Sequence, residues 1–221
     1  MNEEIIGLEA DFANNEYFGT NVWTEEKYRV LSGNVPVLLS APHSVNQIRG
    51  EDVRDAEKYT GALTRFLANA TSSYAIFQIF THADPNTDEE NAYKNAVVNL
   101  VNSYNIKLLL DIHSSTFKDN TDIDIVTNNR ETLRGMDYLF DRLKELGVKY
   151  NIKIDENNVP NKEKENEIIN VTSLICGIPA MRIVINNKRL ETSDEDDSLE
   201  NIISLMAVSY THLTLPTILR V

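Results

Sequence analysis

Apolar residues are grouped in two ways along the chain, and the two patterns predict different elements. Short continuous apolar runs are typical of strands covered on both faces of a sheet, and they predict strands over 35–40, 75–80, 106–112 and 180–185. Apolar residues spaced three and four apart predict helices after Glu57, around 92–100, over 131–147, near 164–175 and near 198–208. Gly147 and Gly177 are expected to end two of these helices.

Turn signals and alternation predict two further strands. Residues 28–31 and 35–40 flank Ser32-Gly33-Asn34, which predicts a hairpin, and residues 148–154 alternate between apolar and polar positions. Strands that alternate with helices are typical of an α/β fold. We therefore predict a three-layer α/β/α sandwich around a mixed, mainly parallel sheet.

The domain organisation follows from the absence of repeats and long linkers, so residues 1–208 are expected to form a single domain. Residues 209–221, SYTHLTLPTILRV, carry no acid, and they interrupt a pattern that is typical of an amphipathic helix. We expect this segment to be a non-native tail derived from a sequencing adaptor, in preference to a natural extended segment.

The composition limits the classes of partner. The chain has 34 acidic and 21 basic residues, a formal net charge of −13, and such a surface repels nucleic acid. Its single cysteine, Cys176, excludes an internal disulfide and fits a reducing compartment. The N-terminus is acidic and no apolar run approaches the roughly 20 residues of a membrane span. We therefore expect a cytoplasmic protein; its oligomeric state is not determined by the sequence.

Two histidines follow buried strands where α/β folds place their ligands, beyond the carboxyl ends of the strands. His43 lies in SAPHS and His113 in DIHSS. Neutral imidazole is a common metal ligand, so this pair favours a metal site over two strand-end histidines with ordinary hydrogen bonds. Asp111 lies on the same strand face as His113 and is expected to orient that ligand or to act on substrate. His82, in THADPN, borders the same edge but is a weaker candidate.

Catalytic zinc requires a third protein ligand and an open position. The acids between His43 and the next predicted helix are Glu51, Asp52, Asp55 and Glu57. Glu57 is expected to begin that helix and to point back at the strand ends, so we favour it over the other three. The charged turn that holds the others is more typical of solvated side chains.

Several segments together resemble the N-formylglutamate amidohydrolase family, which belongs to the zinc-peptidase-like hydrolases. They are SAPHSVNQIRGEDVRDAEKYTGALTRFL, ENAYKN, LLLDIHSS, DIDIVTNN and GIPAMRIVIN, and they span about residues 30–190. The resemblance implies the phosphorylase/hydrolase-like fold of zinc peptidases. It also implies that His43, Glu57 and His113 hold one Zn²⁺ ion.

The resemblance further implies a substrate and a reaction. Zinc lowers the pKa of bound water and polarises an amide carbonyl, so the expected reaction is hydrolysis of a small N-acyl amino acid such as a formyl derivative. Arginine suits a planar carboxylate. Arg49 and Arg54 both follow His43, and Arg49 matches an arginine of the family, so it is the expected substrate-binding residue.

The sequence departs from the family at the expected general base. The family's strand reads Q-[LI]-E-I, whereas this chain has Arg182 for the glutamine and Val184 for the glutamate. Three explanations stay open: a catalytically degenerate relative that binds metal or ligand, replacement of the base by Glu191 or Asp111, or a sequence error. A serine esterase using Ser114 or Ser115 is disfavoured because no G-x-S-x-G motif exists.

Overall fold

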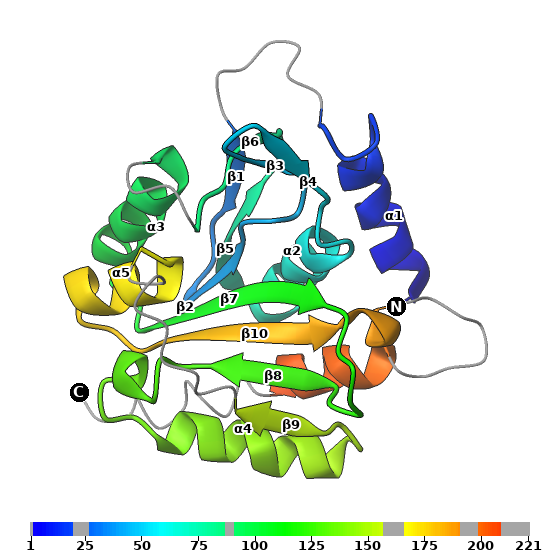
Figure 1. Cartoon of the computed structure of the whole chain (residues 1–221). Helices are drawn as coiled ribbons and strands as arrows, with labels where there is room; N and C mark the ends of the chain where they lie inside the picture. The colour runs from blue at the N-terminus through cyan, green and yellow to red at the C-terminus, as the bar shows by residue number, and fades with distance from the viewer. Residues whose placement is uncertain (1, 20–26, 87–90, 157–165, 191–198, 209–221) are drawn as a thin grey trace.

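The computed structural model describes residues 2–19, 27–86, 91–156, 166–190 and 199–208. A seven-stranded mixed sheet forms its centre, in the order β1-β5-β2-β7-β10-β8-β9 (Figure 1). These strands are β1 (Tyr28–Leu31), β2 (Val35–Ala41), β5 (Ser73–Gln78), β7 (Leu108–Ser115), β8 (Ile123–Val126), β9 (Ile154–Glu156) and β10 (Ala180–Asn186). The pairs β5–β2, β2–β7, β7–β10 and β8–β9 are parallel, and β1–β5 and β10–β8 are antiparallel.

Helices cover both faces of this sheet (Figure 1), which confirms the predicted α/β fold class. The helices are α1 (Asn2–Ala13), α2 (Thr60–Thr71), α3 (Ala92–Ser103), α4 (Tyr138–Lys149), α5 (Ile168–Cys176) and the helical residues 199–208. Val37 and Leu39 of β2 belong to the buried cluster that includes α1, α2, α4 and 199–208, whereas Leu38 belongs to the cluster that includes α3 and α5. None of the helices in the described ranges is long and apolar enough to cross a membrane.

A smaller sheet lies beyond the carboxyl ends of the central strands, in the order β4-β3-β6. It consists of β3 (Gln47–Arg49), β4 (Asp52–Arg54) and β6 (His82–Ala83). The apolar pattern gave no signal for these short strands, nor for α1 and β8. The small sheet brings the segment after His43 beside the segment after β5.

The predicted hairpin over residues 28–40 is wrong. β1 pairs antiparallel with β5, while β2 lies on the other side of β5 and pairs with it in parallel. The connection passes the start of β5, where the N–H groups of Asn34 and Val35 both donate to the carbonyl oxygen of Ser72. The turn signal was therefore correct, but both edges of β2 are occupied by the parallel neighbours β5 and β7.

The segment around Gly147 also differs from the prediction. The predicted helix over 131–147 is split into a 3₁₀ turn, Glu131–Leu133, and α4, which continues past Gly147 to Lys149. A Cβ on Gly147 would lie 2.8 Å from the Ile152 carbonyl oxygen, so this glycine admits the returning chain instead of ending the helix. The predicted strand over 148–154 is wrong for nearly all of its length, because Val148 and Lys149 belong to α4 and β9 begins only at Ile154. Gly177, in contrast, ends α5 with a φ of 69°, as predicted.

Candidate metal centre

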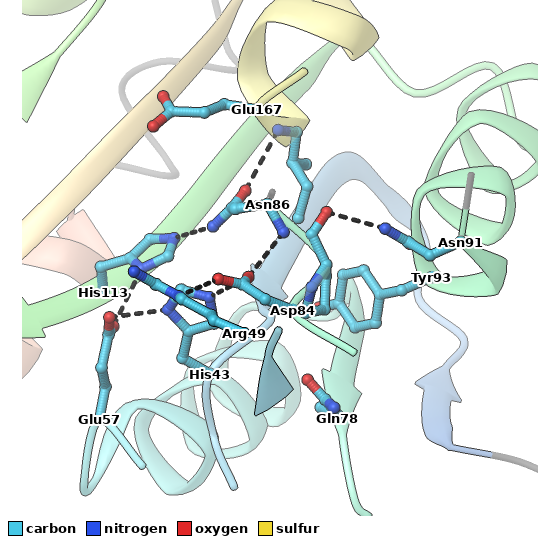
Figure 2. Close-up of polar contacts among 12 residues, drawn as sticks. His43, Arg49, Glu57, Gln78, Asp84, Asn86, Asn91, Tyr93, His113 and Glu167 are labelled. Atoms are coloured by element: carbon cyan, nitrogen blue, oxygen red, sulfur yellow. Dashed lines mark hydrogen bonds and ion pairs between the residues drawn. The ribbon is translucent and has the colours of Figure 1, made fainter. Parts of the chain in front are cut away.

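The neighbouring parallel strands β2 and β7 bring His43 and His113 together. His43 lies two residues after the end of β2, and His113 lies near the carboxyl end of β7. Their rings meet edge to face, with centroids 4.8 Å apart (Figure 2). Glu57 joins them from the loop before α2. The helix begins at Thr60 and not at Glu57 as predicted; Glu57 reaches the cluster because its N–H donates to the His43 carbonyl oxygen at 2.9 Å.

Glu57 lies between the two imidazoles and offers one carboxylate oxygen to each. Its Oε1 is 2.8 Å from Nδ1 of His43, and its Oε2 is 2.9 Å from Nδ1 of His113. The N–H of Ser114 donates to Oε2 at 2.9 Å, which fixes the carboxylate plane from a third direction. One ligand atom from each of the three residues lies within 4.8 Å of the others, so the cluster has the composition and spacing of a metal site.

The outer nitrogen of each histidine meets a second carboxylate. Nε2 of His43 is 2.8 Å from Oδ1 of Asp84, and Nε2 of His113 is 2.9 Å from Oδ2 of Asp111. Both aspartates are completely buried. A carboxylate behind a ligating histidine holds the proton on the outer nitrogen and leaves the inner one free to ligate. The nitrogen and oxygen donors of this set are of the kind that zinc takes, and Nδ1 is the atom of each histidine that would ligate a metal ion.

The electrostatics of the metal-free cluster favour positive charge between the acids. Burial alone would lower the pKa of His43, but Glu57 and Asp84 raise it to about 9. Burial acts on His113 in the same direction, and Glu57 and Asp111 raise its pKa as well. Burial would raise the pKa of Glu57, but the two histidines hold it well below its ordinary value. The cluster thus stabilises cations where a metal ion would lie.

Asp111 has the position expected of a residue that orients His113. Its Oδ1 accepts a hydrogen bond from Ser40 at 2.7 Å, and Ser40 lies 3.1 Å from the Tyr93 hydroxyl. Arg182 of β10 lies 3.7 Å from the other oxygen and is itself paired with Glu167 at 3.0 Å. Asp111 is enclosed by these partners. This suits a role in orienting His113, and it leaves the carboxylate inaccessible to a water molecule that a general base would have to deprotonate.

Arg49 of β3 lies beside the cluster and Arg54 of β4 does not. The Nε of Arg49 forms an ion pair with Asp84, the aspartate that contacts Nε2 of His43 (Figure 2). The Arg49 side chain is 42% exposed, so part of its guanidinium remains accessible to a ligand. Arg54 is 3.9 Å from Asp52 on the exposed hairpin, away from the site.

Sequence reasoning missed Asp84 and Asn86. Asn86 donates its N–H to Asp84 at 2.8 Å, its amide nitrogen lies 3.4 Å from Nε2 of His113, and its oxygen accepts from the Ile168 N–H at 3.2 Å. Both residues belong to THADPN, the segment in which His82 was the candidate, and His82 is exposed on β6. The available signal was an acid and an amide following a buried strand at the same sheet edge.

Val184 lies directly beside His113, in register between β10 and β7. Its half-buried side chain shares a sheet face with Arg182, two residues earlier. The position is therefore suitable for a group that acts next to the cluster, but valine supplies neither charge nor proton acceptor. Glu191, the other proposed replacement, lies outside the described residues, as does the segment 209–221.

The loop that carries Glu57 is held by the first helix. Glu9 of α1 is buried, and its Oε1 accepts from the Tyr59 N–H and from the Tyr17 hydroxyl, both at 2.8 Å. Tyr59 has a left-handed φ of 66°, a conformation that costs a non-glycine residue energy unless its surroundings fix it.

We expect Glu9→Ala to weaken zinc binding by about tenfold, the lower end of the effect of removing a residue that supports a metal ligand. Glu9→Gln retains an oxygen that accepts the Tyr59 N–H and should bind zinc nearly as the unaltered protein does. Competition with a chromophoric chelator measures both affinities. Equal zinc affinities for the alanine variant and the parent protein would mean that α1 does not position the ligand loop.

The chain is similar to known proteins in its structure and not in its sequence. No protein family and no curated protein sequence matches the chain. N-formylglutamate amidohydrolase from Ralstonia eutropha JMP134 superposes with a TM-score of 0.57 at 10% identity, over 85% of this chain and 97% of the other. The fold is similar to that of N-formylglutamate amidohydrolase. This agrees with the fold that the sequence resemblance implied.

Two further solved structures have the same fold. YNDL, in a zinc-free form, has a TM-score of 0.55 at 15% identity, over 88% of this chain and 95% of its own. A bacteriophage poly-gamma-glutamate hydrolase has a TM-score of 0.50 at 9% identity, over 86% and 91%. The similar structures thus include an amidohydrolase and a second hydrolase, and the shared property at these identities is the fold.

Proposed function

We propose that the protein is a zinc-dependent amidohydrolase that cleaves the amide of a small N-acyl amino acid. The observation that carries the proposal is the placement of Glu57 between the Nδ1 atoms of two histidines whose Nε2 atoms are each backed by a buried aspartate. The fold similarity to an N-formylglutamate amidohydrolase, and to a protein known in a zinc-free form, supports the same proposal.

The chain's own residues account for binding and orientation. Bound zinc would polarise the amide carbonyl and acidify water. Asp84 and Asp111 hold the Nε2 protons of the histidines, and Asp84 also orients Arg49 through its second oxygen. The exposed part of the Arg49 guanidinium is placed to bind the substrate carboxylate in the planar manner that arginine favours.

The decisive experiment combines metal analysis with an assay. Purified protein should contain one zinc per chain, and it should release glutamate from N-formyl- or N-acetylglutamate in a reaction that chelation abolishes and zinc restores. Activity that survives removal of the metal would favour a serine esterase. Zinc-free preparations that also fail to take up zinc would contradict the metal centre.

A second candidate function is a non-catalytic relative that binds metal or ligand, and Val184 is the observation that favours it. The position beside His113 carries no proton acceptor, although hydrolysis in the resembling family uses a glutamate there. Stoichiometric zinc without turnover of any N-acyl amino acid is the result expected for this alternative.

Zinc binding is expected to release protons. In the metal-free protein the pKa of His43 is about 9, so its imidazole is protonated at neutral pH, and zinc requires the neutral Nδ1. Lower pH strengthens the competing protonation, so zinc affinity should fall about tenfold or more for each pH unit below 8. Calorimetry in buffers of different ionisation enthalpy measures the release, for which we expect about one to two protons. A pH-independent affinity would contradict the site.

A further inference from the structure

A cavity opens beside the most exposed of the three candidate ligands. The side chain of Glu57 is 21% exposed, against 3% for His43 and 5% for His113. A cavity of about 370 Å³ begins at Glu57 and Ser114, and it extends to Asn187 and Leu190 in the segment after β10. A ligand can therefore approach the cluster along this cavity, past Glu57.

Arg49 does not line this cavity. Arg49 is attached through Asp84 to the outer nitrogen of His43, whereas the cavity adjoins Ser114, the residue after His113. A substrate whose carboxylate binds Arg49 and whose amide lies at the cluster has its acyl group directed away from Arg49. The cavity beside Glu57 offers room for that group.

The cavity is much larger than a formyl group. Formyl has two heavy atoms and fills about the space of two water molecules, roughly 60 Å³. A cavity of about 370 Å³ falls within the usual range for small-molecule sites. A formyl substituent would leave most of it unfilled, while an aminoacyl group would occupy more of it.

The lining of the cavity is polar and of both charges. Asp55 is exposed and, within the described ranges, its carboxylate has no ion-pair partner. Lys58, which belongs to the same loop as Asp55, also lines the cavity. Ser114 and Asn187 contribute a hydroxyl and an amide to the lining. Buried Leu190 adds an apolar wall. A carboxylate in such a lining can bind an ammonium group, and the neighbouring hydrogen-bond donors can bind a carbonyl oxygen. The lining therefore suits an aminoacyl group, which carries both.

We propose that this cavity is the acyl subsite and that it takes an aminoacyl group, with the ammonium at Asp55. The inference rests on the proposed function and names its substrate class as dipeptide-like amides with a carboxylate at the far end. Hydrolysis would break the carbon–nitrogen bond of the amide, adding hydroxyl from water to the acyl carbon and hydrogen to the leaving amine, so that two amino acids are released.

The test compares three substrates of the zinc-loaded protein: N-formyl-, N-propionyl- and alanyl-glutamate. Propionyl is alanyl without its amine. We expect kcat/KM to rise at least tenfold from formyl to propionyl through filling of the cavity, and by about fivefold more from propionyl to alanyl through the ammonium. Asp55→Asn should abolish the increase in kcat/KM from propionyl to alanyl and keep the increase from formyl to propionyl. Asn187→Trp should reduce both increases.

Binding is measured separately, with ketomethylene analogues of the alanyl and propionyl compounds in which CH₂ replaces the amide N–H. Tighter binding of the alanyl analogue, lost in Asp55→Asn, supports the subsite even when no substrate is cleaved; in that case the hydrolase proposal alone fails. Equal affinity for the two analogues, or a substitution at Asp55 that leaves the preference intact, would overturn the inference.

Discussion

Replacing His113 with alanine is expected to abolish stoichiometric zinc binding and to destabilise the metal-free fold by about 3–5 kcal/mol. The imidazole supplies one of three proposed ligand atoms and also lies between buried Asp111 and half-buried Glu57. Nδ1 meets Glu57 at 2.9 Å and Nε2 meets Asp111 at 2.9 Å, so its loss leaves both carboxylates facing a void. Arg182, 3.7 Å from Asp111, and His43, 2.8 Å from Glu57, remain and offset only part of this loss. Zinc content after dialysis and urea unfolding of the metal-free protein measure the two effects.

Two further variants make this test specific. His82→Ala removes an exposed histidine near the same sheet edge and should retain both zinc and stability. His113→Gln can preserve the contact with Asp111 while losing the inner nitrogen, so it should stay folded and still fail to bind zinc. A full equivalent of zinc in His113→Gln would exclude His113 as a ligand.

Replacing Val184 with glutamate is expected to raise kcat by about 10²–10⁴-fold, the usual contribution of a general base. Residue 184 is paired in register with His113, and its side chain lies on the same face of the sheet. A carboxylate there would stand next to the cluster and accept a proton from the attacking water. Initial rates on N-acyl amino acids, measured at equal zinc loading, give the change.

The matched control for this substitution is Val184→Gln, which has the same length and no basic oxygen of comparable strength. It should leave kcat at the level of the unaltered protein. A rise in both variants would point to a polar contact with substrate. No rise in Val184→Glu, at full zinc occupancy, would mean that another residue already serves as the base or that the site binds ligand without hydrolysing it.

Local patterns predicted the central strands and several helices because the order of apolar residues within each element reflects which of its faces are buried. The continuous apolar runs of β2, β7 and β10 follow from coverage on both faces, and the helical spacing in α2 and α3 follows from one buried face. The hairpin failed for the opposite reason. Which strand lies next to β1 depends on pairing between distant segments, and the turn at Gly33 carries no information about that choice.

The same distinction applies to the site. His43 and His113 were predictable because each follows a buried strand, and Asp111 because it shares a strand face with His113. Asp84 also follows a buried strand, but that signal does not show which residue it contacts, since it reaches His43 through the pairing of β3 with β6. Glu57 was placed correctly near the histidines, although for a different local reason, because a turn and not the start of a helix directs it.

The order of the strands has a consequence for this chain's evolution. From β2 the chain continues through α2 to β5 on one side, whereas β10 lies on the other side of β7, so the boundary between β2 and β7 is a topological switch point. A crevice forms there from connectivity alone, whichever side chains line it. Loss of a catalytic group at position 184 would therefore leave this crevice intact, and the protein could still bind a ligand there without catalysing a reaction.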